Sequence, residues 1–382
     1  MRGTRLRLAA GFATAGLLLA ACGSDTDTTT ESEESDEESS TTSDDSDDGD
    51  TPAGTVGVIL PDSASSARWE TADRPLLQEA FDAAGVEVDI QNAEGETSNF
   101  QTIADGMIGA GYAALLIVNL DSETGTAVIS NAAAAGIPVI DYDRLTLGGG
   151  AEYYVSFDNV AVGTAIGEGL VTCLQEDGVD EGDVVLLNGS PTDNNATLFK
   201  EGYEAAVTEA GYGIADDQAV PDWDNTQAGT IFEQIFTGTG GDFVGVASAN
   251  DGLGGAVISV LDRNGLAGEI PVTGQDATDE GLQRVLLGTQ CVTVYKAIKD
   301  EADAAAALAV ALATGDTDAA DAIADGSVED TETGEQVKSA LLTPQPIFAD
   351  TVKDVVADGF TTADALCTTE ELQQACEEYG VE

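Results

Sequence analysis

Beyond residue 54, short apolar runs alternate with longer segments in which apolar residues recur every three or four positions. The runs at 55–61 and 114–120 are apolar at nearly every position, which is typical of strands buried on both faces of a parallel sheet. The segment 74–85 has the periodicity of an amphipathic helix and ends in glycine, a common residue after a helix C-terminus. The alternation predicts an α/β fold in which helices cover both faces of a parallel sheet.

The alternation comes in two successive sets of similar size. The first set ends with a strand at 137–143, and the second begins with a strand at 153–159. The second set ends with strands at 269–277 and 290–296, and an alanine-rich helix at 300–315 follows it. Two sets predict two doubly wound parallel-sheet lobes, with a ligand held where the carboxyl ends of both sheets face each other.

The N-terminus has a different pattern, in which three arginines precede an apolar run that ends at Ala21. The following "LAAC" sequence, with Cys22 last, resembles the bacterial lipoprotein signal, in which this cysteine becomes the lipid-bearing first residue. The alternative is an ordinary signal peptide with an incidental cysteine. Residues 1–21 are therefore expected to be a signal peptide, and an acylated Cys22 would hold an exported protein at the outer face of the bacterial cell membrane.

Residues 22–54 are dominated by Ser, Thr, Asp, Glu and Gly and contain no large apolar residue. A stretch of this composition buries too little apolar surface to offset the entropy of ordering, so it predicts a disordered acidic tether. The aspartates at 44–50 lack the closing glutamate of a calcium loop, and no metal or cofactor is expected.

The charge balance excludes several classes of function. The chain has 71 acidic and 13 basic residues and no histidine, and its formal net charge is −58. Such a field disfavours nucleic acid as a partner. The absence of histidine removes Ser-His-Asp and Cys-His catalysis and histidine zinc sites.

Four cysteines remain beyond Cys22, and an even number in an exported chain favours disulfides. Cys367 and Cys376 bracket a short acidic segment with helical character, so their pairing would close a small loop. Cys173 and Cys291 would then pair with each other. The alternative is a set of buried free thiols.

Polar side chains follow nearly every apolar run of the body at the point where the strand is expected to end. These strand-end residues are Asp62 with Arg68 and Trp69, Asn119, Asp143 with Arg144, Asp193 with Asn194 and Asn195, Asn250 with Asp251, Asp276, and Lys296. Each one taken singly is a common helix-capping or turn residue. Because parallel strands bring their carboxyl ends to one edge, the whole set predicts a polar cleft.

The few cations and the two tryptophans indicate what such a cleft would bind. Arg68, Arg144 and Lys296 are strand-end residues in a chain that has few basic residues. Carboxylates, amides and guanidinium groups together suit vicinal hydroxyls, which both donate and accept hydrogen bonds. Trp69 and Trp223, the only tryptophans, could form flat walls for a sugar ring. Their charged neighbours favour loops over core packing.

An ordered set of motifs carries a resemblance to a known family. The motifs are "ARWE" (67–70), "IDYDR" (140–144), "YVSFDNVAVG" (154–163), "NGSPTDNNATLF" (188–199), "DWDNTQA" (222–228), "ASANDGLGGA" (247–256), "VTGQDA" (272–277), "GTQCVTVYK" (288–296) and "LLTP" (341–344). From about residue 56 to 360 the chain resembles the periplasmic sugar-binding proteins of ABC importers, of the D-xylose-binding type. The tail beyond Phe360 is extra.

The resemblance implies a type I Venus-flytrap fold, with two lobes joined by three crossings. The crossings are expected near Phe157–Asp158, near Tyr295–Lys296 and near Leu341–Thr343. The implied division is 55–157 plus 297–341 for the N-terminal lobe, 158–296 plus 342–366 for the C-terminal lobe, and 367–382 for the tail. The implied sugar ligands are Arg68, Trp69, Asp143, Arg144, Asp193, Asn194, Asn195, Trp223, Asn250, Asp276 and Lys296.

These expectations together indicate a binding protein rather than an enzyme. It would be a monomer that captures a monosaccharide, D-xylose in the first place, by closing its lobes and delivers the sugar to an ABC permease. Two alternatives stay open at this point. The protein could report bound sugar to a membrane kinase, or its ligand could be another aldopentose or an aldohexose.

Overall fold

The structure is a computed structural model that describes residues 54–382. The signal peptide, most of the tether and the lipid-bearing Cys22 expected from the sequence lie outside the described residues. Within the described part, no helix combines the length and the apolar character that crossing a membrane requires. The same residues contain no group of three or more Cys, Asp or Glu side chains arranged to hold a metal ion.

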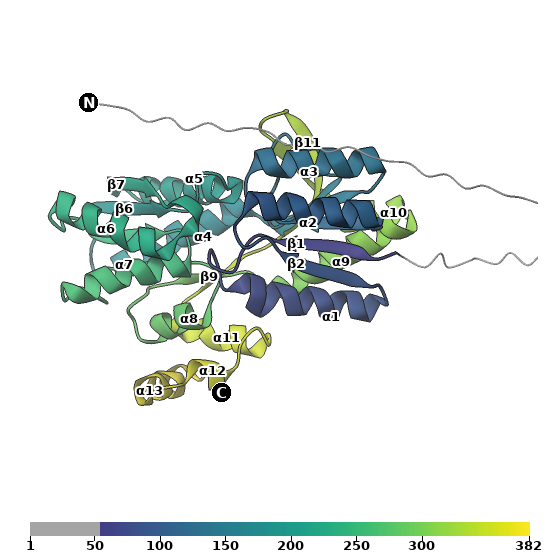
Figure 1. Ribbon diagram of the computed structural model, residues 1–382. Coiled ribbons are helices and arrows are strands. Elements are labelled where there is room, and N and C mark those ends of the chain that lie inside the picture. The colour runs from purple at the N-terminus through teal and green to yellow at the C-terminus, as the bar shows by residue number, and fades with distance from the viewer. Residues whose placement is uncertain (1–53) are drawn as a thin grey trace, which may run out of the picture. The chain divides into compact units, whose positions relative to one another are not determined.

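A seven-stranded sheet forms the first layer, in the order β10-β11-β5-β4-β3-β1-β2. Figure 1 labels β1, β2 and β11 of this sheet. Its strands are β1 (Val56–Leu60), β2 (Val88–Asn92), β3 (Ala114–Ile117), β4 (Val139–Tyr142), β5 (Tyr153–Phe157), β10 (Gly326–Asp330) and β11 (Glu335–Leu342). Its helices are α1 (Arg74–Ala84), α2 (Thr97–Ala110), α3 (Ser122–Ala135), α9 (Ile298–Thr314) and α10 (Thr317–Ile323).

The two faces of this sheet bury alternate residues of the same strand. In β3, Leu115 and Ile117 pack with α2 and α3, whereas Ala114 and Leu116 pack with α1 and α9. Successive side chains of a strand point to opposite faces, so a strand that is apolar at every position is covered on both. The continuous apolar run in the sequence therefore reflects a strand that is buried on both faces, as was predicted.

The second sheet has three strands in the order β7-β6-β8, which are β7 (Gly213–Ala219), β6 (Asp183–Asn188) and β8 (Gly245–Ser248). Its helices are α4 (Asn159–Glu176), α5 (Asn194–Glu209), α6 (Asn225–Thr239) and α7 (Asp251–Arg263). Isolated bridges from Val246 to Val272 and from Thr273 to Val292 lead from β8 towards a two-stranded sheet. That sheet consists of β9 (Thr293–Tyr295) and β12 (Gln345–Ile347).

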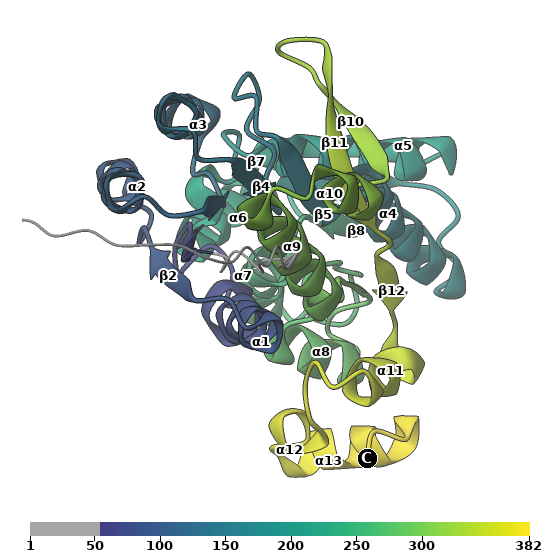
Figure 2. The same ribbon diagram turned by 90° about the vertical axis from the view of Figure 1, so that its right-hand side faces the viewer.

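Two features differ from the sequence predictions. The expected strand at 269–277 is present only as isolated bridges, and its chain turns at Asp276 and Ala277, which have φ angles of 96° and 50°. The first sheet is also not wholly parallel, since β10 and β11 form an antiparallel hairpin on its edge. Figure 2 shows this hairpin extending beyond the neighbouring helix α10.

Two of the expected crossings lie next to each other in paired strands. Leu342 of β11 is the register partner of Phe157 of β5, and the amide of Asp158 donates to the carbonyl of Leu342 over 2.9 Å. Tyr295 of β9 pairs in turn with Gln345 of β12. These strands carry the chain between the two sheets, and the lobe boundaries given above stay a prediction.

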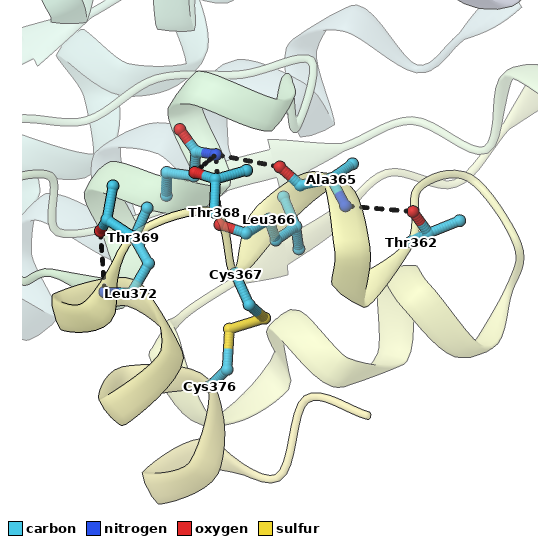
Figure 3. The surroundings of a disulfide bond; sticks show 9 residues. Thr362, Ala365, Leu366, Cys367, Thr368, Thr369, Leu372 and Cys376 are labelled. Carbon is cyan, nitrogen blue, oxygen red and sulfur yellow. Dashed lines mark hydrogen bonds between the residues drawn. A yellow bond between two sulfur atoms is a disulfide. The ribbon is translucent and has the colours of Figure 1, made fainter.

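The C-terminal segment packs on α8 (Asp279–Leu286) and is not detached from the body. It contains α11 (Val352–Ala357), α12 (Ala363–Leu366) and α13 (Glu370–Tyr379). The amide of Gln283 on α8 donates to the carbonyls of Ala365 and Leu366 over 3.1 and 3.2 Å. The structure joins Cys367 to Cys376 across this segment (Figure 3) and Cys173 to Cys291 within the body, the pairing expected from the sequence.

Candidate functional site

Polar side chains from both sheets surround a cavity with about 300 Å³ of empty space. Ten of the eleven predicted ligand residues line it, namely Arg68, Trp69, Asp143, Arg144, Asp193, Asn195, Trp223, Asn250, Asp276 and Lys296. The remaining one, Asn194, is not among the lining residues. Neighbouring positions on a helix point about 100° apart, so Asn195 can face the cavity while Asn194 at the start of α5 does not.

Four lining residues were not predicted from the sequence: Ser65, Ser66, Phe199 and Gln275. Gln275 and Phe199 stand within the motifs "VTGQDA" and "NGSPTDNNATLF", but a residue type gives no sign of which way its side chain points. The two serines belong to a loop of small residues after β1, whose path the apolar pattern does not determine.

The guanidinium group of Arg68 is held by three carboxyl groups. Its Nε and Nη2 donate to Asp73 over 2.8 and 2.7 Å, and Nη2 also donates to Glu301 over 2.7 Å. Nη1 donates to Asp143 over 2.8 Å. An arginine has five N–H donors in a planar fork, so these contacts fix the orientation of the group and leave one Nη1 donor without an assigned partner.

Asp73 and Glu301 stand behind Arg68 and do not line the cavity. Both carboxyl groups are fully buried, and the hydroxyl of Tyr142 donates to Asp73 over 2.8 Å. Burial raises the pKa of Glu301 to about 8, against the opposing effect of the Arg68 charge. Burial also lowers the pKa of Arg68, but the charges of Asp73, Asp143 and Glu301 outweigh it and raise this pKa above its ordinary value. Sequence analysis did not find these two acids, since neither follows a strand.

Asp143 stands between two cations at the end of β4. Besides the contact with Arg68, its Oδ2 lies 3.7 Å from the ammonium of Lys296, which is 3.1 Å from Asp276 Oδ1. Burial would raise the pKa of Asp143, but the charges of Arg68, Lys296 and Arg144 outweigh it and lower this pKa. Asp143 is therefore kept ionised.

Asp193 forms a second group of contacts at the end of β6. Its Oδ2 lies 3.0 Å from Arg144 Nε and accepts a hydrogen bond from Trp223 Nε1 over 3.1 Å. Its Oδ1 accepts from the backbone N–H of Asn195 over 2.9 Å, so the residue is also the N-cap of α5. Burial raises the pKa of Asp193, and the neighbouring Arg144 charge opposes this.

The two tryptophans are walls of the cavity and members of the hydrophobic cores at the same time. Trp69 begins the short π-helix η1 (Trp69–Asp73), and Trp223 ends the 3₁₀ turn η2 (Pro221–Trp223). Both are buried, at 2% and 5% exposure, so the expectation of loop positions was only partly right. A Cβ at Gly189 would lie 2.1 Å from the Trp223 ring, which means that the ring occupies this space only because residue 189 is glycine.

Backbone strain is concentrated at this cavity. Within the described residues, six non-glycine positions have positive φ, and three of them line the cavity: Asp143 (62°), Trp223 (55°) and Asp276 (96°). Positive φ is uncommon outside glycine and unfavourable for a bulky residue such as tryptophan. Strain of this kind persists where the surroundings hold it in place, and it clusters at functional sites.

Several hydrogen bonds join the two sides of the cavity. Asn195 on α5 donates to the backbone carbonyl and the carboxylate of Asp143 over 2.8 and 3.2 Å. Asn250, the N-cap of α7, donates to the carbonyl of Ser65 over 3.3 Å. The Arg144–Asp193 pair spans the same gap, so elements of both sheets are tied together around the cavity.

Three other strand-end residues have structural roles outside the cavity. Asp62 accepts from the backbone amides of Ala64 and Ser65, and Asn119 donates to the carbonyl of Arg144. Asp251 binds side chains of its own lobe. Asp62 has the turn role expected of such a residue, whereas Asn119 and Asp251 join segments that are distant in the sequence.

The lining side chains have a balanced set of charges. Three carboxylates (Asp143, Asp193 and Asp276) face three cations (Arg68, Arg144 and Lys296). The amides, serine hydroxyls and aromatic rings complete the lining. Such a set can accept and donate hydrogen bonds to a neutral polar molecule, but it lacks the excess of one charge that an ion would require.

Comparison with known proteins agrees with this geometry. Residues 56–317 match the family described as a periplasmic binding protein domain. The D-xylose-binding periplasmic protein of Escherichia coli (strain K12) is 33% identical over 310 residues, which cover 80% of this chain and 90% of that protein. The multiple sugar-binding periplasmic receptor ChvE of Rhizobium radiobacter is 30% identical over 336 residues, covering 82% and 92%.

A solved structure has a similar fold. The carbohydrate transporter solute binding protein of Chloroflexus aurantiacus, in complex with D-glucose, superposes with a TM-score of 0.72 and 25% identity. The match covers 81% of this chain and 97% of that one. The type I architecture of α/β lobes with largely parallel sheets, expected from the sequence, is thereby confirmed.

Proposed function

The chain belongs to the periplasmic binding protein domain family, and on that premise we propose that it captures one monosaccharide and delivers it to an ABC permease. The family consists of solute-binding proteins rather than enzymes. The proposed preferred ligand is D-xylose, the sugar in the name of the Escherichia coli relative. No cofactor takes part in this function.

The observation that carries the proposal is the balanced lining of the cavity. Three buried carboxylates and three buried cations form ion pairs with one another, so the site attracts neither an anion nor a cation strongly. A sugar hydroxyl donates one hydrogen bond and accepts others, and it can therefore bind a carboxylate on one side and a guanidinium on the other. A neutral polyol fits this lining better than a charged solute does.

The aromatic residues support a ring-shaped ligand. Trp69, Trp223 and Phe199 line the same cavity, and Phe199 packs edge-on against Trp223 with ring centroids 6.4 Å apart. Arg68 and Arg144 lie over the Trp69 ring, at 4.5 and 5.5 Å from its centroid. These contacts keep the Trp69 ring in one orientation, and the CH faces of a pyranose can pack on such a surface.

Capture would proceed by closure of the two predicted lobes around the sugar. The contacts of Asn195 with Asp143, of Arg144 with Asp193 and of Asn250 with Ser65 cross between the two sides. Each of them would break when the lobes open and form again when they close. In this proposal the closed form is the one that the permease binds.

The membrane location is a further part of the proposal. A lipid-bearing Cys22 and an acidic tether would hold a monomeric protein at the outer face of the cell membrane, near the permease. The name of the Rhizobium radiobacter relative includes the word receptor, which favours sensing as a second candidate function. Deletion of the cognate permease genes separates the two, because it would stop uptake and leave a sensing response intact.

Isothermal titration calorimetry of the purified protein against aldopentoses and aldohexoses tests the proposed ligand. We expect one-to-one binding of D-xylose, with D-ribose and D-glucose about 10-fold to 100-fold weaker, because one misplaced hydroxyl leaves a buried partner unpaired. Tighter binding of D-glucose would correct the sugar and keep the class of ligand. Absence of binding to every monosaccharide would refute the proposal.

A further inference from the structure

Gln275 differs from the other amide side chains that line the cavity. Its side chain is buried, with 4% exposure, and its Oε1 has no hydrogen-bond partner within residues 54–382. The amides of Asn195 and Asn250 both have protein partners at each end. A buried polar atom without a partner is unfavourable and uncommon in folded proteins. The carboxamide oxygen of Gln275 is therefore available to accept a hydrogen bond from a ligand.

The backbone around Gln275 is held on both sides. The amides of Gly274 and Asp276 donate to Val292 and Val294 over 3.0 and 2.9 Å, and the carbonyl of Gln275 accepts from Asp251 over 3.0 Å. The Cα position of residue 275 is therefore fixed. The side chain can rotate about its own bonds, but the loop cannot carry it away from the cavity.

The neighbouring polar groups of the cavity are already engaged with one another. Asp276 accepts from Ser66 over 2.9 Å and pairs with Lys296, and Ser65 accepts from Trp69 over 3.1 Å. A ligand that inserted between these pairs would have to compete with existing contacts. At Gln275 it would form a hydrogen bond with no protein contact to displace.

We propose that the carboxamide of Gln275 binds a hydroxyl group of the captured sugar, with Oε1 accepting a hydrogen bond from that hydroxyl. We propose also that this contact contributes to the choice between epimers. The inference rests on the proposed function. The carboxamide carries a hydrogen-bond donor and an acceptor side by side. It can therefore bind a sugar hydroxyl that points towards it and not the epimeric hydroxyl that points away. Neither the strand-end pattern nor the motifs in the sequence assigned this residue a role.

The substitution Gln275→Leu tests the proposal, because it should weaken sugar binding without lowering the stability of the sugar-free protein. Calorimetric titration with D-xylose should give a dissociation constant about 10-fold to 100-fold higher, because the hydroxyl is left unpaired in a closed cavity. Thermal unfolding of the sugar-free protein should give a Tm that is unchanged or raised, since an unpartnered buried amide has been removed. Gln275→Met provides a second, unbranched variant if leucine disturbs folding.

Gln290→Leu is the matched control, a buried glutamine near the same loop but outside the cavity. Its Nε2 donates to Asp251 over 2.7 Å, and its Oε1 accepts from Arg284 over 3.0 Å. Its loss removes one of the four hydrogen bonds to the buried Asp251 carboxylate and the hydrogen bond from the half-buried Arg284. We therefore expect a lower Tm and little change in the dissociation constant for D-xylose, the reverse of the Gln275→Leu result.

Titration with monodeoxy derivatives of D-xylose identifies the hydroxyl. One derivative should bind the wild type and Gln275→Leu with nearly equal affinity, because the contact is already missing. If the wild type binds D-xylose and Gln275→Leu binds it equally well, the inference about Gln275 is wrong and the proposed function stands. If the wild type binds no monosaccharide, the proposed function fails and this inference fails with it.

Discussion

Two buried aspartates, Asp193 and Asp251, follow neighbouring strands of the same sheet and have different surroundings. Asp251, after β8, accepts four hydrogen bonds: from Gln290 (2.7 Å), from Thr293 (2.8 Å), and from the backbone and hydroxyl of Thr278 (2.9 and 3.1 Å). Asp193, after β6, binds Trp223, Arg144 and the backbone of Asn195, and it faces the cavity. The hydrogen-bonding capacity of the Asp251 carboxylate is used by neighbouring protein groups, whereas the Asp193 carboxylate faces the cavity with capacity to spare.

The chain also packs more tightly around Asp251 than around Asp193. A Cβ at Gly274 or Gly281 would lie 2.2 or 2.1 Å from the Asp251 carboxylate, so the chain closes tightly around it. The partners of Asp193 include Trp223, which has a strained backbone with a φ of 55°. The comparison indicates that complete internal hydrogen bonding marks a residue that supports the fold. Strained backbone and spare hydrogen-bonding capacity mark a residue that meets a ligand.

Asp193→Ala should have the largest effect on binding. It leaves Arg144 without its buried partner and removes the proposed contact to the sugar, which should cost about 2–5 kcal/mol, or roughly 30-fold or more in affinity. Calorimetry with D-xylose measures this loss. Asp224→Ala is the matched control, because Asp224 caps α6 through the amides of Thr226 and Gln227 and does not line the cavity. If both variants bind sugar normally and only unfold earlier, Asp193 is a helix cap and no more.

Asp251→Ala should have the largest effect on stability. Four donors lose their acceptor in a buried site, and we expect the free energy of unfolding to fall by about 2–4 kcal/mol. Urea denaturation measures this change, and the affinity for D-xylose should stay within about threefold of the wild type. A loss of sugar binding comparable to that of Asp193→Ala, at a temperature where the variant is folded, would remove the distinction between the two sites.

Glu301→Gln should have a smaller effect, visible in the pH dependence of stability. Burial raises the pKa of Glu301 from 4.5 to about 8, so the folded state keeps a proton that the unfolded chain has lost. This contribution to stability is fully present below pH 4.5 and is lost as the pH rises through about 8, at no more than about 1.4 kcal/mol per pH unit. Glutamine cannot ionise, so the variant should show a flatter decline between pH 5 and 8.

Urea denaturation at a series of pH values gives this comparison. The Glu301 carboxyl contacts Arg68, and the charges of Asp143, Asp73 and Lys296 also act on its pKa. Asp141 and Asp251 contribute in the same direction, since burial raises their pKa values to about 7 and about 6. A residual decline is therefore expected in the variant. Parallel curves for the wild type and Glu301→Gln would show that Glu301 is ionised in the folded protein at neutral pH.

The strand-end rule predicted most of the site because the carboxyl ends of parallel strands converge. It found Asp143, Asp193 and Asp276 in this way. It could not separate Asp251 from them, since the same residue type follows the same kind of strand and only the three-dimensional packing decides which carboxylate is saturated. Gln275 was missed because the left-handed turn at Asp276 and Ala277 is not visible in the apolar pattern.

Most of the fold, like most of the site, was predicted from the sequence. Continuous apolar runs predicted the parallel strands and the helices that cover them. The hairpin of β10 and β11 was not predicted, because its exposed and partly charged residues resemble a loop in sequence. The position of the C-terminal segment was also not predicted, since it depends on long-range contacts such as those between Gln283 and the carbonyls of Ala365 and Leu366.

The most direct test of the account uses the intrinsic fluorescence of the protein. The chain has two tryptophans, Trp69 and Trp223, and both line the cavity. Titration of the purified protein with D-xylose should therefore change the tryptophan emission in a saturable manner with one site, and the change should be lost in Asp193→Ala and kept in Asp251→Ala. An emission that stays constant for every monosaccharide, or a change that survives in Asp193→Ala with unaltered affinity, would contradict the assignment of this cavity as the sugar site.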